Sequence, residues 1–193
     1  MAALPPFHVA VAPVTAAELG RSWHPGCPVG PRQLRAVHVS FVGFDGRART
    51  GAIIVHQGVT GEVTTIFRRL YAARFPIRRL EAIDRYGGSD RRSMAADNTS
   101  GFNCRYASVP GPKRWSAHAY GKAIDVNTIE NPYVQGGYVN PAAGRAYLDR
   151  SRCRKGMAVA GGVLVRAFAA VGWYWGGRWA GTPDYQHFSA TGG

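Results

Sequence analysis

Four residues in two short segments have the types and spacing expected of a metal site. His118 and Asp125 lie seven residues apart in SAHAYGKAIDV (116–126), and Asp184 and His187 lie three residues apart in DYQHF (184–188). Zinc accepts imidazole nitrogen and carboxylate oxygen, and a catalytic zinc has three protein ligands and an open position. His118, Asp125 and His187 would supply the ligands, and Asp184 would remain as a carboxylate nearby. The alternative is a hydrogen-bonded histidine–aspartate pair without a metal.

The local sequence favours a turn and a strand between His118 and Asp125. Gly121 and the β-branched residues Ile124 and Val126 are poor helix formers. A turn at Gly121 followed by a short strand would bring Asp125 back toward His118. Side chains alternate along a strand, so Asp125 would point away from the apolar face that Ile124 and Val126 form.

These motifs resemble those of a known enzyme family. SAHAYGKAID is similar to the S-x-H-x-x-G-x-A-x-D motif of the zinc D-alanyl-D-alanine carboxypeptidases and dipeptidases, which include VanY- and VanX-type enzymes and phage L-alanyl-D-glutamate endopeptidases. DYQHF resembles the family's second motif, an acid three residues before the last zinc histidine, and GFNCR (101–105) resembles its upstream arginine segment. The matching positions of the first motif are Ser116, His118, Gly121, Ala123 and Asp125.

The resemblance implies a role for each matching residue. His118, Asp125 and His187 would bind Zn²⁺, and a zinc-activated water would be the nucleophile. Asp184 would be the general base, where several family members have glutamate. Arg105 would stabilise the oxyanion, and Ser116 would orient the substrate.

The implied function is hydrolysis of an amide bond next to a D-amino acid in peptidoglycan stem peptides. Both a D,D-carboxypeptidase and an L-alanyl-D-glutamate-type endopeptidase fit the motifs. One alternative is a catalytically silent zinc or cell-wall-binding module on the same fold, against which the intact Asp184 and Arg105 argue. Another is a basic nucleic-acid-binding domain.

The net charge of +13 predicts attraction to polyanions, including the anionic bacterial cell wall. The chain has neither a basic tail nor a basic amphipathic helix, so we do not expect specific nucleic-acid binding. No apolar run is long enough for a membrane-spanning helix. The first 20 residues lack a charged start and have two early prolines, Pro5 and Pro6, so we do not interpret them as a signal peptide. We expect a monomer that acts outside the cell or at the cell wall, after removal of a signal or by phage-type release.

Three cysteines leave several states open. Either one disulfide and one free thiol form, or all three are thiols. A nucleophilic Cys104 beside His118 is a further alternative, to which we prefer an inert buried thiol.

We expect the histidines outside the two motifs to be structural or exposed. The three C-terminal tryptophans would be either a sugar-stacking platform or packing residues. These residues are His8, His24, His38 and His56, and Trp173, Trp175 and Trp179.

The helices and strands expected to position these residues indicate an α+β fold. Alternation over 33–44, a turn over 45–51 and a second strand over 52–56 predict a β-hairpin. Apolar residues at helical spacing predict an amphipathic helix over 60–75. We expect a strand from residue 77, an irregular loop over 88–117, and a strand over 123–126. A buried helix over 157–171 and a hairpin of 172–179 with 184–188 would close the chain.

The expected architecture is a single domain in which helices pack on a small antiparallel sheet that carries the zinc site. Residues 1–32 are rich in proline, alanine and glycine and are expected to form an extended N-terminal arm. Residues 33–193 would be the zinc peptidase catalytic domain.

Overall fold

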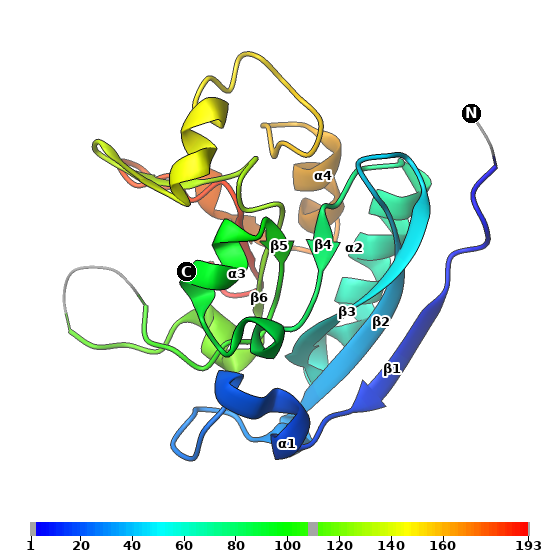
Figure 1. Cartoon of the computed structure of the whole chain (residues 1–193), viewed down its shortest axis with the longest axis vertical. Coiled ribbons are helices and arrows are strands. Elements are labelled where there is room, and N and C mark those ends of the chain that lie inside the picture. Colours follow the sequence, from blue (N-terminus) through cyan, green and yellow to red (C-terminus); the bar gives the residue numbers. More distant parts are fainter. Residues whose placement is uncertain (1–2, 108–111, 193) are drawn as a thin grey trace.

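A three-stranded antiparallel sheet forms one side of the protein in the computed structural model, which describes residues 3–107 and 112–192 (Figure 1). Its strands are β1 (Val9–Pro13), β2 (Leu34–Val42) and β3 (Ala48–His56), with β2 in the centre. Helix α2 (Thr60–Ala72) packs against β2. The predicted hairpin and the predicted amphipathic helix are therefore confirmed.

A second antiparallel sheet carries the candidate site. Its central strand, β10 (His187–Ser189), pairs with β6 (Ala123–Asp125) on one side and with β9 (Tyr174–Trp175) on the other. Helix α4 (Val163–Ala169) packs against α2 and β9. The predicted strand at 123–126 and the predicted C-terminal hairpin are both present.

Shorter elements complete the chain. A parallel pair is formed by β4 with β5, and an antiparallel hairpin by β7 with β8. The bounds of these elements and of the two short helices are α1 (Ala16–Leu19), β4 (Arg79–Leu80), α3 (Asp90–Ala95), β5 (Asn98–Thr99), β7 (Tyr133–Gln135) and β8 (Tyr138–Asn140). Among the described residues, no helix combines the length and the apolar character needed to cross a bilayer.

One continuous hydrophobic core joins both sheets and both long helices. It includes Val37 from β2, Phe67 from α2, Ile124 from β6, Phe168 from α4 and Phe188 from β10, all of them buried. The rings of Phe168 and Phe188 stack with their centroids 4.0 Å apart. The shared core confirms a single-domain α+β fold with small antiparallel sheets, and it fixes the strands that carry the candidate site.

Three expected elements differ from the structure. The helix predicted over 157–171 is limited to α4, because Gly162 is its N-cap and Gly161 has a φ of 69°, outside the helical region. The strand expected from residue 77 is only two residues long. The loop expected over 88–117 contains α3, which begins where the Ser89 hydroxyl accepts a hydrogen bond from the backbone N–H of Arg92.

The segment before residue 33 takes part in the folded structure. Strand β1 pairs with β2 over five residues, and Leu19 and Val29 are buried in a smaller core with Leu34 and Phe102. A disulfide joins Cys27 to Cys104, and Cys153 is a free, exposed cysteine. Cys104 is therefore not the nucleophilic or buried thiol considered above.

A buried pair of carboxyl groups supports the loop that follows β6. Asp97 accepts a hydrogen bond from the backbone N–H of Ile129, and Arg78 bonds to Asp97 at 3.2 Å and to Glu130 at 3.4 Å. Burial of Glu130, together with the adjacent Asp97, raises the pKa of Glu130 to about 8. Glu130 is therefore protonated in the folded protein at neutral pH.

Stability is expected to fall with rising pH because of Glu130. A carboxyl group whose pKa rises on folding stabilises the protein fully below its unfolded pKa, near 4.5. That contribution disappears as pH rises through the folded pKa, about 8. Glu130→Gln keeps the shape of the protonated side chain and cannot become charged. At pH 9 its free energy of unfolding should therefore be roughly 2–4 kcal/mol higher than that of the parent, since one pKa unit is about 1.4 kcal/mol.

Urea unfolding of both proteins between pH 5 and pH 9 measures this difference. Glu18→Gln is the matched control, because Glu18 is an exposed carboxylate whose pKa is lowered by hydrogen bonds to Thr15. The control should gain no stability over the parent at high pH. Parallel pH profiles for Glu130→Gln and the parent would contradict the prediction.

Candidate metal centre

His118 is held by a short 3₁₀ helix with a glycine at its end. The helix, η5 (Ala117–Tyr120), begins where the Ser116 hydroxyl accepts a hydrogen bond from the backbone N–H of His118. It ends at Gly121, whose φ of 64° is left-handed. A Cβ at Gly121 would lie 2.6 Å from the backbone nitrogen of His56, so any larger residue would collide with β3.

Asp125 and His187 face each other across two paired strands. Asp125 is the last residue of β6 and His187 is the first of β10, and the antiparallel register pairs them directly. Opposed residues on one face of an antiparallel pair have neighbouring side chains. The turn at Gly121 brings β6 back beside η5, so all three side chains meet at one end of the second sheet.

The donor atoms of these three residues form a triangle with equal sides. His118 Nε2, Asp125 Oδ1 and His187 Nδ1 lie 3.2 Å from one another. Zinc bonds of roughly 2.0–2.1 Å in a tetrahedron place the ligand atoms roughly 3.3 Å apart. The spacing and chemistry of the donors therefore fit a zinc ion bound by three protein ligands.

Hydrogen bonds around the triangle leave the donor atoms available. His118 Nδ1 donates to the carbonyl oxygen of Gly101 at 2.7 Å, so the lone pair of Nε2 points toward Asp125 and His187. A backbone acceptor on the remote nitrogen is the usual arrangement for a metal-binding histidine. Among the described residues, Asp184 Oδ1 is buried without a hydrogen-bond partner, and so is His187 Nε2, the ring nitrogen of His187 that lies outside the triangle.

The electrostatics of the triangle favour a bound cation. Burial alone would raise the pKa of Asp125, but the charges and hydrogen bonds of His118 and His187 outweigh burial and hold that pKa well below its usual range. Burial lowers the pKa of His187. Burial also opposes a charged His118, yet the charge of Asp125 raises the pKa of His118. A carboxylate that stays ionised between two imidazoles is suited to a divalent cation.

Asp184 lies in the same cleft, between β9 and β10. Its backbone N–H bonds to the carbonyl of Gly176, and its own carbonyl accepts a hydrogen bond from the backbone N–H of His187. Burial and the negative charge of Asp125 raise the pKa of Asp184 to about 8. The group can therefore hold or release a proton near neutral pH.

Arg105 and Ser116 line the cleft as well. The Arg105 Nε lies 3.1 Å from a carboxylate oxygen of Asp90, but its N–H is not directed at that oxygen, so Nε has no hydrogen bond to a described residue. Arg105 is close enough for its charge to lower the pKa of Asp184 and of both histidines. Ser116 lines the cleft, and its hydroxyl caps η5.

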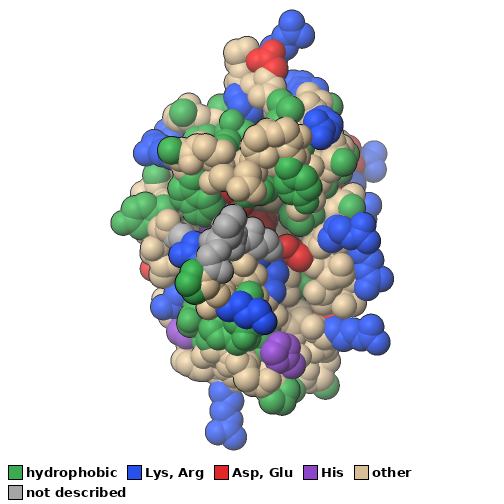
Figure 2. All heavy atoms as spheres, turned by 90° about the vertical axis from the view of Figure 1, so that its left-hand side faces the viewer, with side chains coloured by type: hydrophobic (Ala, Val, Ile, Leu, Met, Phe, Trp, Pro, Cys, Tyr) green, Lys and Arg blue, Asp and Glu red, His purple; other side chains and the backbone are tan. Residues whose placement is uncertain are grey.

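The cleft has a volume of about 470 Å³. Figure 2 shows a face of the protein on which acidic side chains lie inside a hollow between hydrophobic and basic groups. Trp179 is on its wall, with its ring centroid 5.3 Å from that of His187. Trp173 is buried in the core, and Trp175 stacks on Phe188. Trp173 and Trp175 are therefore packing residues, and Trp179 lines the cleft.

Several residues of the cleft were not predicted from the sequence. Asp90, Met94, Tyr133, Asn140 and Gln186 all line it. Gln186 stands inside DYQHF, so its closeness to the site could have been inferred from its neighbours. The others come from α3 and the β7–β8 hairpin, and their sequence has no feature that indicates a site.

Comparison with known proteins agrees with this geometry. Residues 110–190 match the model of a peptidase family described as D-alanyl-D-alanine carboxypeptidase. The match includes His118, Asp125, Asp184 and His187, and it begins after Arg105. It covers 81 of the 193 residues and supports a similarity to this peptidase family. No curated protein and no solved structure matches the chain significantly.

Proposed function

We propose that the protein is a zinc-dependent peptidase that hydrolyses an amide bond next to a D-amino acid in peptidoglycan stem peptides. The observation that carries this proposal is the triangle of His118, Asp125 and His187 donor atoms, 3.2 Å apart, with the buried Oδ1 of Asp184 in the same cleft. The family match over the same segment supports the substrate class. A cell-wall substrate also suits the net charge of +13 and an extracellular place of action.

Each residue then has a defined role. His118, Asp125 and His187 hold the zinc ion, which when bound would polarise the scissile carbonyl and lower the pKa of water to about 7. Asp184 takes the proton of the attacking water and returns it to the leaving amine. Arg105, permanently charged and planar, stabilises the oxyanion that develops on the carbonyl oxygen. The Ser116 hydroxyl orients the substrate backbone.

Digestion of purified peptidoglycan tests the proposal. The protein with added zinc should release peptides or D-alanine, and mass spectrometry should show that each new end adjoins a D-amino acid. The masses also distinguish removal of a terminal D-alanine from cleavage between L-alanine and D-glutamate. A chelator should abolish release, and zinc should restore it, because the ligands alone cannot activate water.

Two results would contradict the proposal. Tight binding to cell walls without any released product, with zinc bound, would indicate a catalytically silent wall-binding module. DNA affinity that falls steeply with salt and does not need zinc would indicate a nucleic-acid-binding protein.

A further inference from the structure

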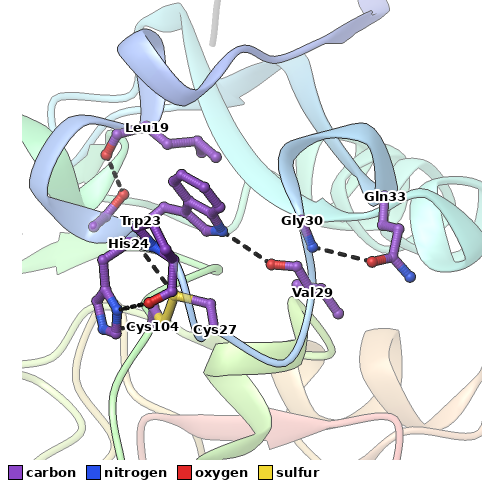
Figure 3. Close-up of a disulfide and its surroundings, with 10 residues drawn as sticks. Leu19, Trp23, His24, Cys27, Val29, Gly30, Gln33 and Cys104 are labelled. Atoms are coloured by element: carbon purple, nitrogen blue, oxygen red, sulfur yellow. Dashed lines mark hydrogen bonds between the residues drawn. A yellow bond between two sulfur atoms is a disulfide. The ribbon is translucent and has the colours of Figure 1, made fainter.

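A second cluster of metal-binding side chains, which shares no residue with the triangle, lies at the N-terminal turn. Figure 3 shows its members around the disulfide. Its members are His24, Cys27 and Cys104, whose donor atoms all lie within 4.8 Å of one another. The two sulfur atoms form the disulfide. None of these residues has a role in the proposed hydrolysis, so an inference drawn from them does not depend on that function.

The turn from His24 to Cys27 holds a histidine and a cysteine toward one point. The backbone N–H of Cys27 bonds to the carbonyl of His24 at 3.2 Å, and the backbone N–H of His24 bonds to Cys27 Sγ at 3.2 Å. Gly26 has a φ of 96°, which this tight turn requires. Two residues separate His24 from Cys27, the same number that separates the cysteines of a C-x₂-C zinc half-site.

The imidazole of His24 is already oriented as a ligand. Its Nδ1 lies 2.8 Å from the carbonyl oxygen of Pro25 and donates a hydrogen bond to it (Figure 3). Nε2 is therefore the nitrogen with a free lone pair, and it lies 3.6 Å from Cys104 Sγ. The same arrangement holds His118 at the triangle, where Gly101 supplies the carbonyl.

The cluster can be reached from solvent. His24 is exposed, and Cys27 and Cys104 are only half-buried. A dithiol in solution can therefore attack the disulfide, and a hydrated metal ion can enter. Two thiolates and one imidazole are the donors that zinc prefers, and a water could complete a tetrahedron.

We propose that His24, Cys27 and Cys104 form a redox-controlled site for a thiophilic divalent metal ion such as Zn²⁺. A dithiol reductant transfers two electrons and two protons to the disulfide, becoming a disulfide itself, and leaves two cysteine thiols. The metal ion then displaces both thiol protons and binds the two thiolates and His24 Nε2. In the oxidised protein the sulfur atoms bind each other, and the site does not form.

The site borders the substrate cleft. Cys104 directly precedes Arg105, and the His24 ring lies with its centroid 6.5 Å from that of Trp115, which lines the cleft. The metal ion would replace the disulfide as the link between the N-terminal turn and the segment that carries Arg105.

Cobalt binding to the full chain with Cys153→Ser tests the site, because this variant removes the remaining thiol. Co²⁺ bound by thiolate shows a near-ultraviolet charge-transfer band, whereas the triangle offers only nitrogen and oxygen donors. After reduction with a phosphine, the protein should bind one equivalent of Co²⁺ with this band, and Zn²⁺ should remove the band. The oxidised protein should show no band.

Histidine variants distinguish this site from cobalt bound by two thiolates alone. His24→Ala keeps both cysteines, and it should weaken cobalt binding by more than about 100-fold, because removing even a hydrogen-bond partner of a ligand costs about 10–100-fold. His38→Ala, at an exposed histidine of β2, should bind like the parent. The proposal is overturned if the reduced parent shows no band, if His24→Ala matches the parent, or if reduction alone unfolds the protein.

Discussion

Asp184→Ala should lower the turnover of peptidoglycan fragments by roughly 100- to 10,000-fold while the protein keeps its zinc. Asp184 supplies none of the three donor atoms of the triangle, and its Oδ1 has no hydrogen-bond partner among the described residues. Burial and the charge of Asp125 raise its pKa to about 8, which suits a group that accepts and returns a proton. The variant loses that group but keeps His118, Asp125 and His187. Steady-state kinetics and zinc analysis of the same samples measure both effects.

Two further variants sharpen this experiment. Asp184→Asn keeps the shape of the side chain but cannot accept a proton, so it should lose turnover to the same extent as Asp184→Ala. Asp149→Ala removes an exposed aspartate and should leave turnover and zinc content unchanged. Normal turnover in Asp184→Asn would show that another group carries the proton.

The sequence predicted the candidate ligands because local chemistry and local structure agree around His118. The glycine turn and the short strand of SAHAYGKAIDV are both present, and they depend only on neighbouring residues. The pairing of Asp125 with His187 could not be predicted in the same way. It depends on the register between β6 and β10, and these two residues lie 62 positions apart in the chain.

Other features were hidden because their partners are distant in the sequence. Cys27 and Cys104 are separated by 77 residues, and three cysteines allow several pairings. Glu130 looks like an ordinary surface acid until the fold buries it beside Asp97 and Arg78. The helix predicted over 157–171 is too long for a local reason. The prediction gave more weight to the apolar residues than to Gly161 and Gly162, and the helix begins only after these two glycines.

His118→Ala should abolish both zinc binding and turnover, and it should remove the stabilisation that zinc gives the parent. A ligand that binds only the folded protein stabilises it by about 2.7 kcal/mol at 100 times its Kd. The thermal midpoint of the parent should therefore rise with added zinc, and that of the variant should not. In the absence of zinc the variant should also be less stable by roughly 3–5 kcal/mol, because Asp125 loses one of its two partners in a buried site.

Calorimetry with and without zinc measures these effects, and His38→Ala serves as the histidine control. His38 is exposed on β2, so this control should bind zinc, cleave peptidoglycan and gain stability as the parent does. Asp184→Ala should lose turnover but keep the zinc-dependent rise of the thermal midpoint. Comparison of Asp184→Ala with His118→Ala therefore separates the binding of the metal from the transfer of the proton. Full zinc stabilisation of His118→Ala would mean that the triangle of His118, Asp125 and His187 is not the metal site, and the role of Asp184 would then have to be reassigned as well.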